Sequence, residues 1–389
     1  MKLSAPLLTA LLLNQFTIHG QGLSDFSYGT DSTFEIVTWN IEWFPKSGMA
    51  TVDSVQSILE SADVDIWAIQ EIDDTTLCRV MVNGIPGYQV YQDDTWFDGL
   101  VYIWKEDEIE LDSVYRIYDT APYWNAFPRS PLVLDFHRND ERWVLINNHF
   151  KCCGDGTLDQ GNSWDEETRR LTASNLLEDY IDENLGDERV VMLGDLNDLL
   201  IDNPTDNVFI AFFDKPLHYR FVDLQIAAGP VDFWSYPGWP SHLDHILVTD
   251  EFFPEIDSGL IEVETLLPEE FMAGFWQYDA FVSDHRPVAM KIYEVQEDSV
   301  SSTYTDAAAQ LEIMVWPNPS SDNFQFHFSA ESLGAVLQIV DLTGRQLDEF
   351  QVQAPNMTWS AAAVEAGLYQ AILSKPDLQS CRFQLLKVD

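Results

Sequence analysis

The feature that most constrains the fold is a series of short apolar runs between about residues 34 and 293. Runs of this length, rich in β-branched and aromatic residues and bounded by turn residues, predict buried strands. Stretches with helical spacing lie between some of them, at residues 52–59 and 166–185. Strands with interspersed helices predict an α/β (α+β) fold, a two-layer β-sandwich flanked by helices. The apolar runs cover residues 34–39, 66–69, 100–104, 132–136, 143–147, 190–193, 245–248 and 288–292.

A change in composition divides the chain after about residue 295. Its 389 residues are enough for two domains. Residues 296–311 are rich in Ser, Thr, Asp and Ala and lack aliphatic periodicity, which predicts a linker. We therefore expect one domain over residues 30–295 and a second over residues 312–389. The second contains short alternating strands with turn residues between them, which predict a small all-β sandwich.

The N-terminus has the pattern of an export signal. Lys2 supplies a basic start, residues 7–13 are apolar, and small residues follow at Gly20 and Gly22. This pattern predicts a signal peptide over residues 1–20, with a buried N-terminal helix as the alternative. No stretch approaches the roughly 20 apolar residues that a membrane-spanning helix needs. We therefore expect an exported protein without a transmembrane segment.

The charge balance is strongly acidic. The chain has 65 Asp and Glu residues against 20 Lys and Arg, a formal net charge of −45. Such a surface repels polyanions at long range, which argues against a protein that coats nucleic acid electrostatically. It does not exclude an enzyme that meets phosphate through a bound divalent cation, because the ion reverses the local field.

Six short polar motifs stand at the ends of predicted strands, where layered α/β folds commonly place function. Each motif alone is a weak signal, because strand ends are often polar. Together and in this order they resemble the endonuclease/exonuclease/phosphatase superfamily, which includes pancreatic deoxyribonuclease and sphingomyelinases. The resemblance covers about residues 34–293, and its fold agrees with the predicted sandwich. The motifs are TWNIE at 38–42, IQEI at 69–72, NNHF at 147–150, GDLND at 194–198, HLDH at 242–245 and SDHRP at 283–287.

The resemblance implies a hard divalent cation, Mg²⁺ with Mn²⁺ or Ca²⁺ as alternatives. Such ions take oxygen ligands and neutralise phosphate charge. By similarity, Glu71 is the main metal carboxylate, and Asn40 and Asp284 complete the shell. Asp195 would hold and deprotonate the attacking water, and Asn197 would donate to the phosphate. The structural alternatives are a solvated strand end for Glu71 and a turn for Asp195 and Asn197.

Two histidines receive catalytic roles from the same resemblance. His285 matches the family's catalytic histidine, with Asp244 orienting its ring. His149 matches the second histidine of the deoxyribonuclease-like members, which assists the leaving oxygen. A lone histidine is more often structural, and we expect that of His245, whereas His242 remains open.

Arg129 and Lys151 are candidate phosphate contacts, with structural ion pairs as the alternative. One departure concerns the tyrosine that many nucleases of this family carry before the third predicted strand. Phe97 and Asp98 occupy that stretch here, and Tyr102 lies inside the strand. This places the abasic-endonuclease subgroup in doubt.

Three cysteines lie in the predicted first domain. Cys152 and Cys153 are adjacent, and adjacent cysteines rarely bond each other. A bridge from one of them to Cys78 is one possibility in an oxidising compartment. Metal binding by these thiols is a weaker alternative, because no CxxC spacing occurs. The CCGDG loop at 152–156 is unlike the mammalian members of the family.

The C-terminal segment resembles the sorting domain of proteins that bacteria export through type IX secretion. The motifs are PNP at 317–319, VDLTGR at 340–345 and AGLY at 366–369. An accessory carbohydrate- or protein-binding sandwich is the alternative. The resemblance implies the type IX machinery as a partner and passage through the periplasm to the cell surface or medium.

The leading functional hypothesis is an extracellular nuclease that hydrolyses phosphodiester bonds in nucleic acid. The alternative is a sphingomyelinase-like or small-molecule phosphodiesterase or phosphatase that uses the same site. A catalytically silent surface protein is a third hypothesis, which the complete set of motifs disfavours.

An aromatic cluster before and after the HLDH motif suits lipid contact, base stacking or simple loop packing. It consists of Trp234, Tyr236, Trp239, Phe275 and Trp276.

Overall fold

The computed structural model describes most of the chain's residues. The predicted signal peptide, the predicted linker, Phe97, Asp98 and the PNP motif lie outside them. The described residues are 22–91, 99–294, 313–316, 320, 323–328, 332–341, 345–364, 366–375 and 381–387.

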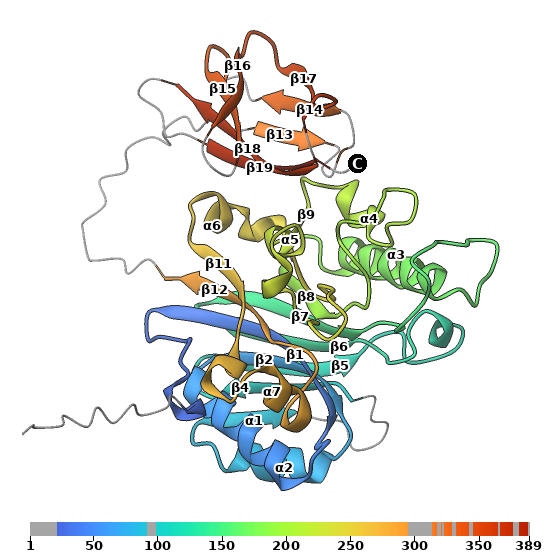
Figure 1. Cartoon of the computed structure of the whole chain (residues 1–389), viewed down its shortest axis with the longest axis vertical. Coiled ribbons are helices and arrows are strands. Elements are labelled where there is room, and N and C mark those ends of the chain that lie inside the picture. Colours follow the sequence, from blue (N-terminus) through green and yellow to red (C-terminus); the bar gives the residue numbers. More distant parts are fainter. Residues whose placement is uncertain are drawn as a thin grey trace, which may run out of the picture.

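Two six-stranded sheets form the larger unit (Figure 1). β1 pairs with β2 and β7 with β8 in parallel, and the remaining neighbours are antiparallel. The first sheet has the order β11 (Ile261–Thr265), β12 (Val288–Tyr293), β1 (Thr33–Phe44), β2 (Ile66–Ile72), β4 (Val101–Lys105) and β3 (Tyr88–Tyr91). The second has the order β5 (Glu110–Arg116), β6 (Leu132–Arg138), β7 (Glu141–His149), β8 (Arg189–Asp195), β10 (Asp244–Thr249) and β9 (Tyr219–Phe221).

Helices cover the outer faces of both sheets (Figure 1). The first sheet packs against α1 (Met49–Ala62) and α2 (Thr75–Asn83), and the second against α3 (Glu166–Asn184) and α4 (Ile210–Phe213). Asp165 caps α3, because its side chain accepts a hydrogen bond from the Thr168 backbone N–H at 2.9 Å. The predicted two-layer sandwich flanked by helices is confirmed. The remaining helices are α5 (Leu224–Ala227), α6 (Phe253–Asp257) and α7 (Phe275–Phe281), with short 3₁₀ turns at Leu23–Asp25, Tyr123–Asn125, Val231–Phe233, Asp250–Phe252 and Pro268–Phe271.

The space between the sheets changes from apolar to polar along the strands. Alternate side chains of a strand point to the same face. On β1, Phe34 and Ile36 belong to the core between the sheets, and Asn40 follows on the same face. On β8, Leu193 is in that core and Asp195 follows it. The inner faces therefore carry polar groups at one end of the sandwich.

A layer of buried amides separates that polar end from the apolar core. Gln70 Nε2 donates to Asn147 Oδ1 at 2.8 Å, which joins the two sheets, and to Thr38 Oγ1 at 3.1 Å. Asn147 Nδ2 donates in return to the Ile69 carbonyl at 3.1 Å. Because these hydrogen bonds cross between the sheets, they hold the strand ends at a defined separation.

The C-terminal segment forms a three-stranded and a four-stranded antiparallel sheet around a separate apolar cluster. This agrees with the predicted small all-β sandwich. The first sheet has the order β13 (Ile313–Trp316), β14 (Asn323–Phe328) and β17 (Asn356–Ser360), and the second β16 (Gln346–Gln351), β15 (Val336–Asp341), β18 (Gly367–Ser374) and β19 (Cys381–Lys387).

None of the helices in the described segments has the length and apolar character to span a bilayer. The longest of these, α3, carries charged side chains near both of its ends.

Candidate active site

Three of the predicted site residues meet at the polar end of the sandwich. The side-chain amide of Asn40 donates to Glu71 Oε1 at 3.1 Å and to Asp195 Oδ2 at 2.9 Å. Its Oδ1 accepts from the Glu42 backbone N–H at 2.9 Å. Asn40 therefore holds a carboxylate from each sheet in a fixed position.

The backbone at Glu71 is shaped to turn its side chain into this group. Glu71 has a left-handed conformation with φ 64°, which is uncommon outside glycine. Gly99 approaches it closely, and a Cβ at Gly99 would lie 3.3 Å from the Glu71 Cα. The second carboxylate oxygen of Glu71 accepts from the Trp43 backbone N–H at 3.1 Å. Both oxygens of this carboxylate are thus oriented by the end of β1.

His285 and Asp244 form a buried pair beside these carboxylates. His285 Nδ1 lies 2.7 Å from Asp244 Oδ2. Its Nε2 is 3.9 Å from Asp195 Oδ2 and 4.0 Å from Asp284 Oδ1, beyond hydrogen-bonding distance. Burial would lower the pKa of His285, but the charges of Asp244 and Asp195 raise it to about 10. The ring is therefore a cation whose Nε2–H faces the opening of the site.

His149 belongs to the same group of side chains, but its pKa is shifted in the opposite direction to that of His285. Its Nε2 is 3.5 Å from Asp195 Oδ2 and 3.7 Å from Glu71 Oε1. Burial lowers the pKa of His149 well below its usual range, and the charges of Arg129 and His285 act in the same direction. The site therefore contains one charged and one neutral imidazole.

The carboxylates of the site are crowded. Burial raises the pKa of Asp195 to about 7, against the charge of His285, and Asp244 and Glu71 raise it further. Burial also raises the pKa of Asp284 to about 6, again against His285. Like charges this close together disfavour one another's ionisation, so a bound cation would relieve the repulsion.

The donor set fits a hard divalent ion. Glu71 and Asp284 present carboxylate oxygens, and their side chains are 19% and 28% exposed. These are the ligand types that Mg²⁺, Mn²⁺ and Ca²⁺ prefer. Asn40 directs its amide nitrogen at the carboxylates, so its clearest role in this structure is to orient Glu71.

Asn197 and Arg129 reach the same region from the second sheet. The Asn197 backbone N–H donates to Asp195 Oδ1 at 3.1 Å, and its side-chain Nδ2 donates to the Phe150 carbonyl at 3.4 Å. Arg129 is half-buried and donates to that same carbonyl at 3.4 Å. Every site residue that the sequence predicted therefore lies within one region at this end of the sandwich.

A second His–Asp cluster lies nearby. We call it closed, because each of its ring nitrogens has a protein partner. Asp223 Oδ2 is 2.6 Å from His245 Nδ1 and 3.1 Å from His242 Nε2. The other ring nitrogens are 2.9 Å from the Asp198 carbonyl and 3.2 Å from the Ser235 backbone N–H. All three side chains are fully buried. This arrangement agrees with the structural role expected for His245 and extends it to His242.

The charges of this closed cluster are balanced. Burial would raise the pKa of Asp223, but the charge of His245 and the hydrogen bonds from both histidines lower it. The charge of Asp223 raises the pKa of His245, whereas burial lowers the pKa of His242. These groups also lie close enough to hold a metal ion, yet each ring nitrogen is already used by a protein partner.

Sequence reasoning missed the groups that fix His285. The hydroxyl of Tyr278 donates to the His285 carbonyl at 2.7 Å, and Trp39 Nε1 lies 3.2 Å from the same oxygen. Ser283 Oγ accepts from the His285 backbone N–H at 2.9 Å. The ring of Tyr236 packs against the imidazole, with 4.7 Å between centroids. Trp39 and Ser283 lie within the TWNIE and SDHRP motifs and Tyr236 within the aromatic cluster, whereas Tyr278 had no sequence signal.

The aromatic cluster does not act as one unit. Trp234 is half-buried and donates through Nε1 to the Ile226 carbonyl at 3.0 Å, which is loop packing. Trp239 and Trp276 are 79% and 67% exposed. Phe275 packs against Tyr278 inside the domain. The expectation of loop packing therefore describes only part of this cluster.

Two further expectations are resolved. Cys78, Cys152 and Cys153 are free thiols, so the suggested bridge to Cys78 is wrong. The physical reason is burial, because Cys78 lies on α2 within the core beneath the first sheet. Tyr102 is fully buried between the sheets, where its hydroxyl donates to the Leu132 carbonyl at 3.2 Å. It is therefore not a substitute for the missing nuclease tyrosine.

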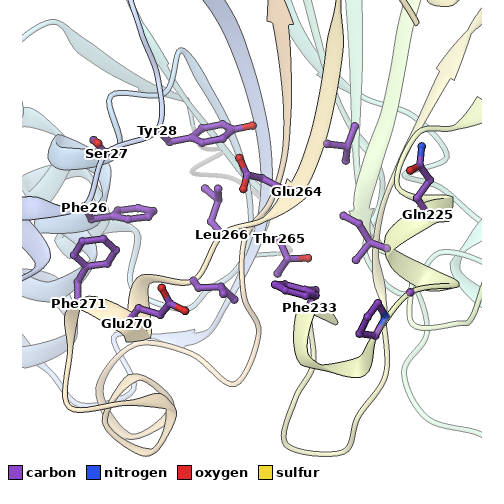
Figure 2. Close-up of a pocket in the computed structure, with 15 residues that line it drawn as sticks. Phe26, Ser27, Tyr28, Gln225, Phe233, Glu264, Thr265, Leu266, Glu270 and Phe271 are labelled. Atoms are coloured by element: carbon purple, nitrogen blue, oxygen red, sulfur yellow. The ribbon is translucent and has the colours of Figure 1, made fainter. Parts of the chain in front are cut away.

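The pocket shown in Figure 2 lies outside the site. It has a volume of about 490 Å³, and its lining includes none of the site residues. The labelled rings of Phe26 and Phe271 pack together on one side, with 5.5 Å between centroids, and Phe233 lies on the other. The candidate active site is instead the polar opening at the strand ends.

Comparisons with known proteins agree with both parts of the chain. The model of the Endonuclease/Exonuclease/phosphatase family matches residues 37–285. The model of the Secretion system C-terminal sorting domain matches residues 314–382. The two resemblances inferred from the motifs are confirmed, and the sorting tail indicates export. A search of curated proteins found no match.

Several solved structures are similar to the larger unit at low sequence identity. D. rerio TDP2 complexed with a single strand DNA product is 15% identical, with a TM-score of 0.50 over 67% of this chain and 99% of that one. Truncated Caenorhabditis elegans TDP2 is 14% identical, with a TM-score of 0.48 over 67% and 98%. The human Nocturnin catalytic domain with bound sulfate is 15% identical, with a TM-score of 0.48 over 67% and 94%.

Proposed function

Because the chain belongs to the endonuclease/exonuclease/phosphatase family, we propose that it is an exported, divalent-metal-dependent nuclease that hydrolyses phosphodiester bonds. One observation carries the proposal. The carboxylates of Glu71 and Asp195 are joined by Asn40 at the polar end of the sandwich, and Nε2 of His285 lies 3.9 Å from Asp195 Oδ2. Acidic oxygens for a cation and a cationic donor for a phosphate thus stand side by side.

The metal would be held by Glu71 and Asp284, with Asn40 fixing the orientation of Glu71. A bound Mg²⁺, with Mn²⁺ or Ca²⁺ as alternatives, neutralises the phosphate oxygens that otherwise repel a nucleophile. A ligand that binds only the folded protein raises its thermal midpoint. We therefore expect Mg²⁺ to raise the melting temperature of the wild type and not that of Glu71→Gln.

The chain's own residues supply the remaining chemistry. Asp195 is placed to hold a water and take its proton, and the neighbouring Asn197 amide can donate to a phosphate oxygen. His285 donates its Nε2–H to the charge that develops on the phosphate, while Asp244 fixes the ring. His149, on the far side of Asp195, is placed to assist the leaving oxygen.

Two exposed tryptophans near the site support nucleic acid as the substrate. Trp43 is 63% exposed, and its backbone N–H donates to Glu71. Trp239 is 79% exposed in the turn closed by the bridge between Tyr236 and Ser241, beside His285. Indole rings stack on unpaired bases without sequence preference. We therefore propose single-stranded nucleic acid as the preferred form.

A second candidate is a sphingomyelinase-like or other small phosphodiesterase. It is favoured by the shortage of cations at the opening. Lys46 is paired with Glu42 and Asp279, and Lys151 lies 3.9 Å from Glu166, which leaves Arg129 as the stronger candidate for a phosphate contact among the described residues. A duplex-binding enzyme normally neutralises several phosphates with Lys and Arg. Small diesters and lipid headgroups do not require this.

The test is hydrolysis of a substrate panel by the full chain with Mg²⁺, Mn²⁺ or Ca²⁺. The panel contains single-stranded DNA, plasmid DNA, RNA, sphingomyelin vesicles and a chromogenic phosphodiester. We expect cleavage of the single-stranded substrates to be fastest, and EDTA to abolish it. Cleavage of the lipid or the small diester alone would replace the nuclease with the second candidate.

Matched variants show whether this site is responsible. Asp195→Asn and His285→Ala should both abolish hydrolysis. Tyr102→Phe removes a buried hydroxyl outside the site and should leave the rate unchanged. Failure of the intact chain on every substrate and metal would overturn the proposal.

A further inference from the structure

Two thiols meet at the rim of the candidate site. Cys152 and Cys153 follow β7 by three and four residues, and their Sγ atoms lie 3.0 Å apart. Cys153 is exposed and Cys152 is half-buried. A disulfide bond is about 2.05 Å long, so only ~1 Å of sulfur movement separates the thiols from bonding distance. Cys78 is buried in the core and does not compete.

A buried arginine holds the loop in this conformation. Arg170 Nη1 donates to the carbonyls of Lys151 and Cys153, both at 2.7 Å. Its Nε and Nη2 pair with Asp198 at 2.7 Å and Glu167 at 3.1 Å. Arg170 is 2% exposed. Since the carbonyls on both sides of the Cys152 side chain are fixed by one rigid group, the two thiols are held together by the fold.

The chain turns sharply at the second thiol. Cys153 has φ 71°, and Gly154 follows with φ 115°. A Cβ at Gly154 would lie 2.1 Å from Glu167 Oε1, so the loop requires glycine there. The backbone N–H of Gly156 donates to that same oxygen at 2.8 Å. The left-handed turn and its anchor together place both sulfurs on one side of the loop.

The surroundings of the sulfurs suit thiol exchange. Lys151 Nζ lies 3.7 Å from Cys152 Sγ and can act as counterion for a sulfur that has lost its proton. The hydrogen bond to Cys152, together with burial, raises the pKa of the Cys153 thiol, which lowers its thiolate fraction, so the exchange at Cys153 speeds up as pH rises. The exposed sulfur of Cys153 is the one that an external disulfide can reach.

We propose that Cys152 and Cys153 are a redox-active pair that forms a vicinal disulfide by exchange with an external disulfide donor. The Cys153 sulfur attacks the donor disulfide, which forms a mixed disulfide and releases one donor thiol. The Cys152 sulfur then attacks Cys153 Sγ and releases the second donor thiol. The two cysteines are oxidised by two electrons, the donor disulfide is reduced, and the two protons end on the donor thiols.

Such a bond would be reversible rather than a permanent cross-link. Adjacent Cα atoms are about 3.8 Å apart, whereas ordinary disulfides join Cα atoms about 4.4–6.8 Å apart. A bridge between neighbours is therefore strained and easily reduced. The sorting tail directs the chain out of the cytoplasm, into compartments where disulfides form. The proposal is independent of the hydrolytic activity.

Peptide mass spectrometry tests the pair directly. The full chain is incubated with oxidised glutathione, quenched with acid, alkylated with iodoacetamide and digested with trypsin. Cleavage after Lys151 and Arg169 releases residues 152–169, which contain these two cysteines and no other. We expect this peptide to be unalkylated and lighter by two hydrogen atoms. After treatment with dithiothreitol it should carry two alkyl groups.

Two variants separate the proposal from other outcomes. In Cys152→Ser, the peptide should retain a glutathione adduct on Cys153, because the second attack is lost. Cys78→Ser should leave the result for residues 152–169 unchanged. Full alkylation of both thiols after oxidation, two stable glutathione adducts, or a bridge to Cys78 would each overturn the proposal.

Discussion

The two buried His–Asp clusters of the larger unit contain the same types of side chain but differ in how they are used. In the Asp223 cluster, every ring nitrogen of His242 and His245 has a protein partner. In the site cluster, Nε2 of His285 lies 3.9 Å from Asp195 and forms no hydrogen bond to it. Composition and burial do not separate these clusters. The difference is whether a ring nitrogen is left for an external group.

The electrostatics of the two clusters differ in the same way. The histidines lower the pKa of Asp223 against the effect of burial, so folding stabilises its charge. Burial raises the pKa of Asp195 to about 7 even though His285 is near, so folding disfavours its charge. The charge of Asp223 thus contributes to stability, whereas the charge of Asp195 costs stability. The following predictions test this contrast, from the largest effect to the smallest.

Asp195→Asn should have the largest effect, and it should affect activity alone. We expect kcat to fall by about 10³-fold or more, because the group that holds and deprotonates the water is lost. The melting temperature should stay equal or rise, since a disfavoured buried charge is removed. Initial rates and calorimetry on the same preparation measure both. Activity within tenfold of wild type would show that Asp195 is not catalytic.

Asp223→Asn should show the reverse pattern. Removing one partner of a buried ion pair costs about 3 kcal/mol of unfolding free energy. The specific activity of the folded fraction should change little, because Asp223 does not face the opening. Urea denaturation and rates at a temperature below the transition measure the two effects. A large loss of kcat at unchanged stability would place Asp223 in the catalytic machinery. The distinction between a structural and a catalytic cluster would then be wrong.

Arg129→Ala should weaken substrate binding at the open cluster. We expect KM to rise about tenfold, which corresponds to about 1.4 kcal/mol, with a smaller change in kcat. Arg129→Lys should recover part of the loss, because it retains the charge without the bidentate fork. Steady-state kinetics on the cleaved substrate measure this. An unchanged KM in both variants would limit Arg129 to its contact with the Phe150 carbonyl.

Glu35→Gln should give the smallest effect and concerns a buried carboxyl with no histidine partner. Burial, with the charge of Asp65 nearby, raises the pKa of Glu35 from 4.5 to about 7. Between these values the folded state binds more protons than the unfolded state, so wild-type stability falls as pH rises through this window. The variant should lose this slope and be more stable at pH 8 by about 1 kcal/mol. Chemical denaturation from pH 4.5 to 8 measures the slope, and an identical slope in both proteins would contradict the assignment.

Much of this protein was predictable because its signals are local. The buried strands were identified from runs of four to six apolar residues, and α3 from the length of its helical pattern. Asn139 and Asp140, which join β6 to β7, both have positive φ, as is typical of turn residues of these types. The helices α2 and α4 to α7 were missed, since segments of four to nine residues have little periodicity to detect. The motifs at the strand ends indicated the family and the candidate site residues other than Arg129.

The sequence by itself determined which side chains stand at the polar end of the sandwich, because strand alternation and motif order are written along the chain. Only the tertiary structure decided what each of them does. His285 is held in place by Trp39 and Tyr278, which lie near opposite ends of the domain's sequence. His245 has no ring nitrogen left for an external group because Asp223 occupies Nδ1 and a backbone carbonyl occupies Nε2. Cys78 forms no bridge to the other thiols because it is buried in the core. A hydrogen bond or a charge acts over a few ångströms of space, and folding alone determines which distant residues come within that range.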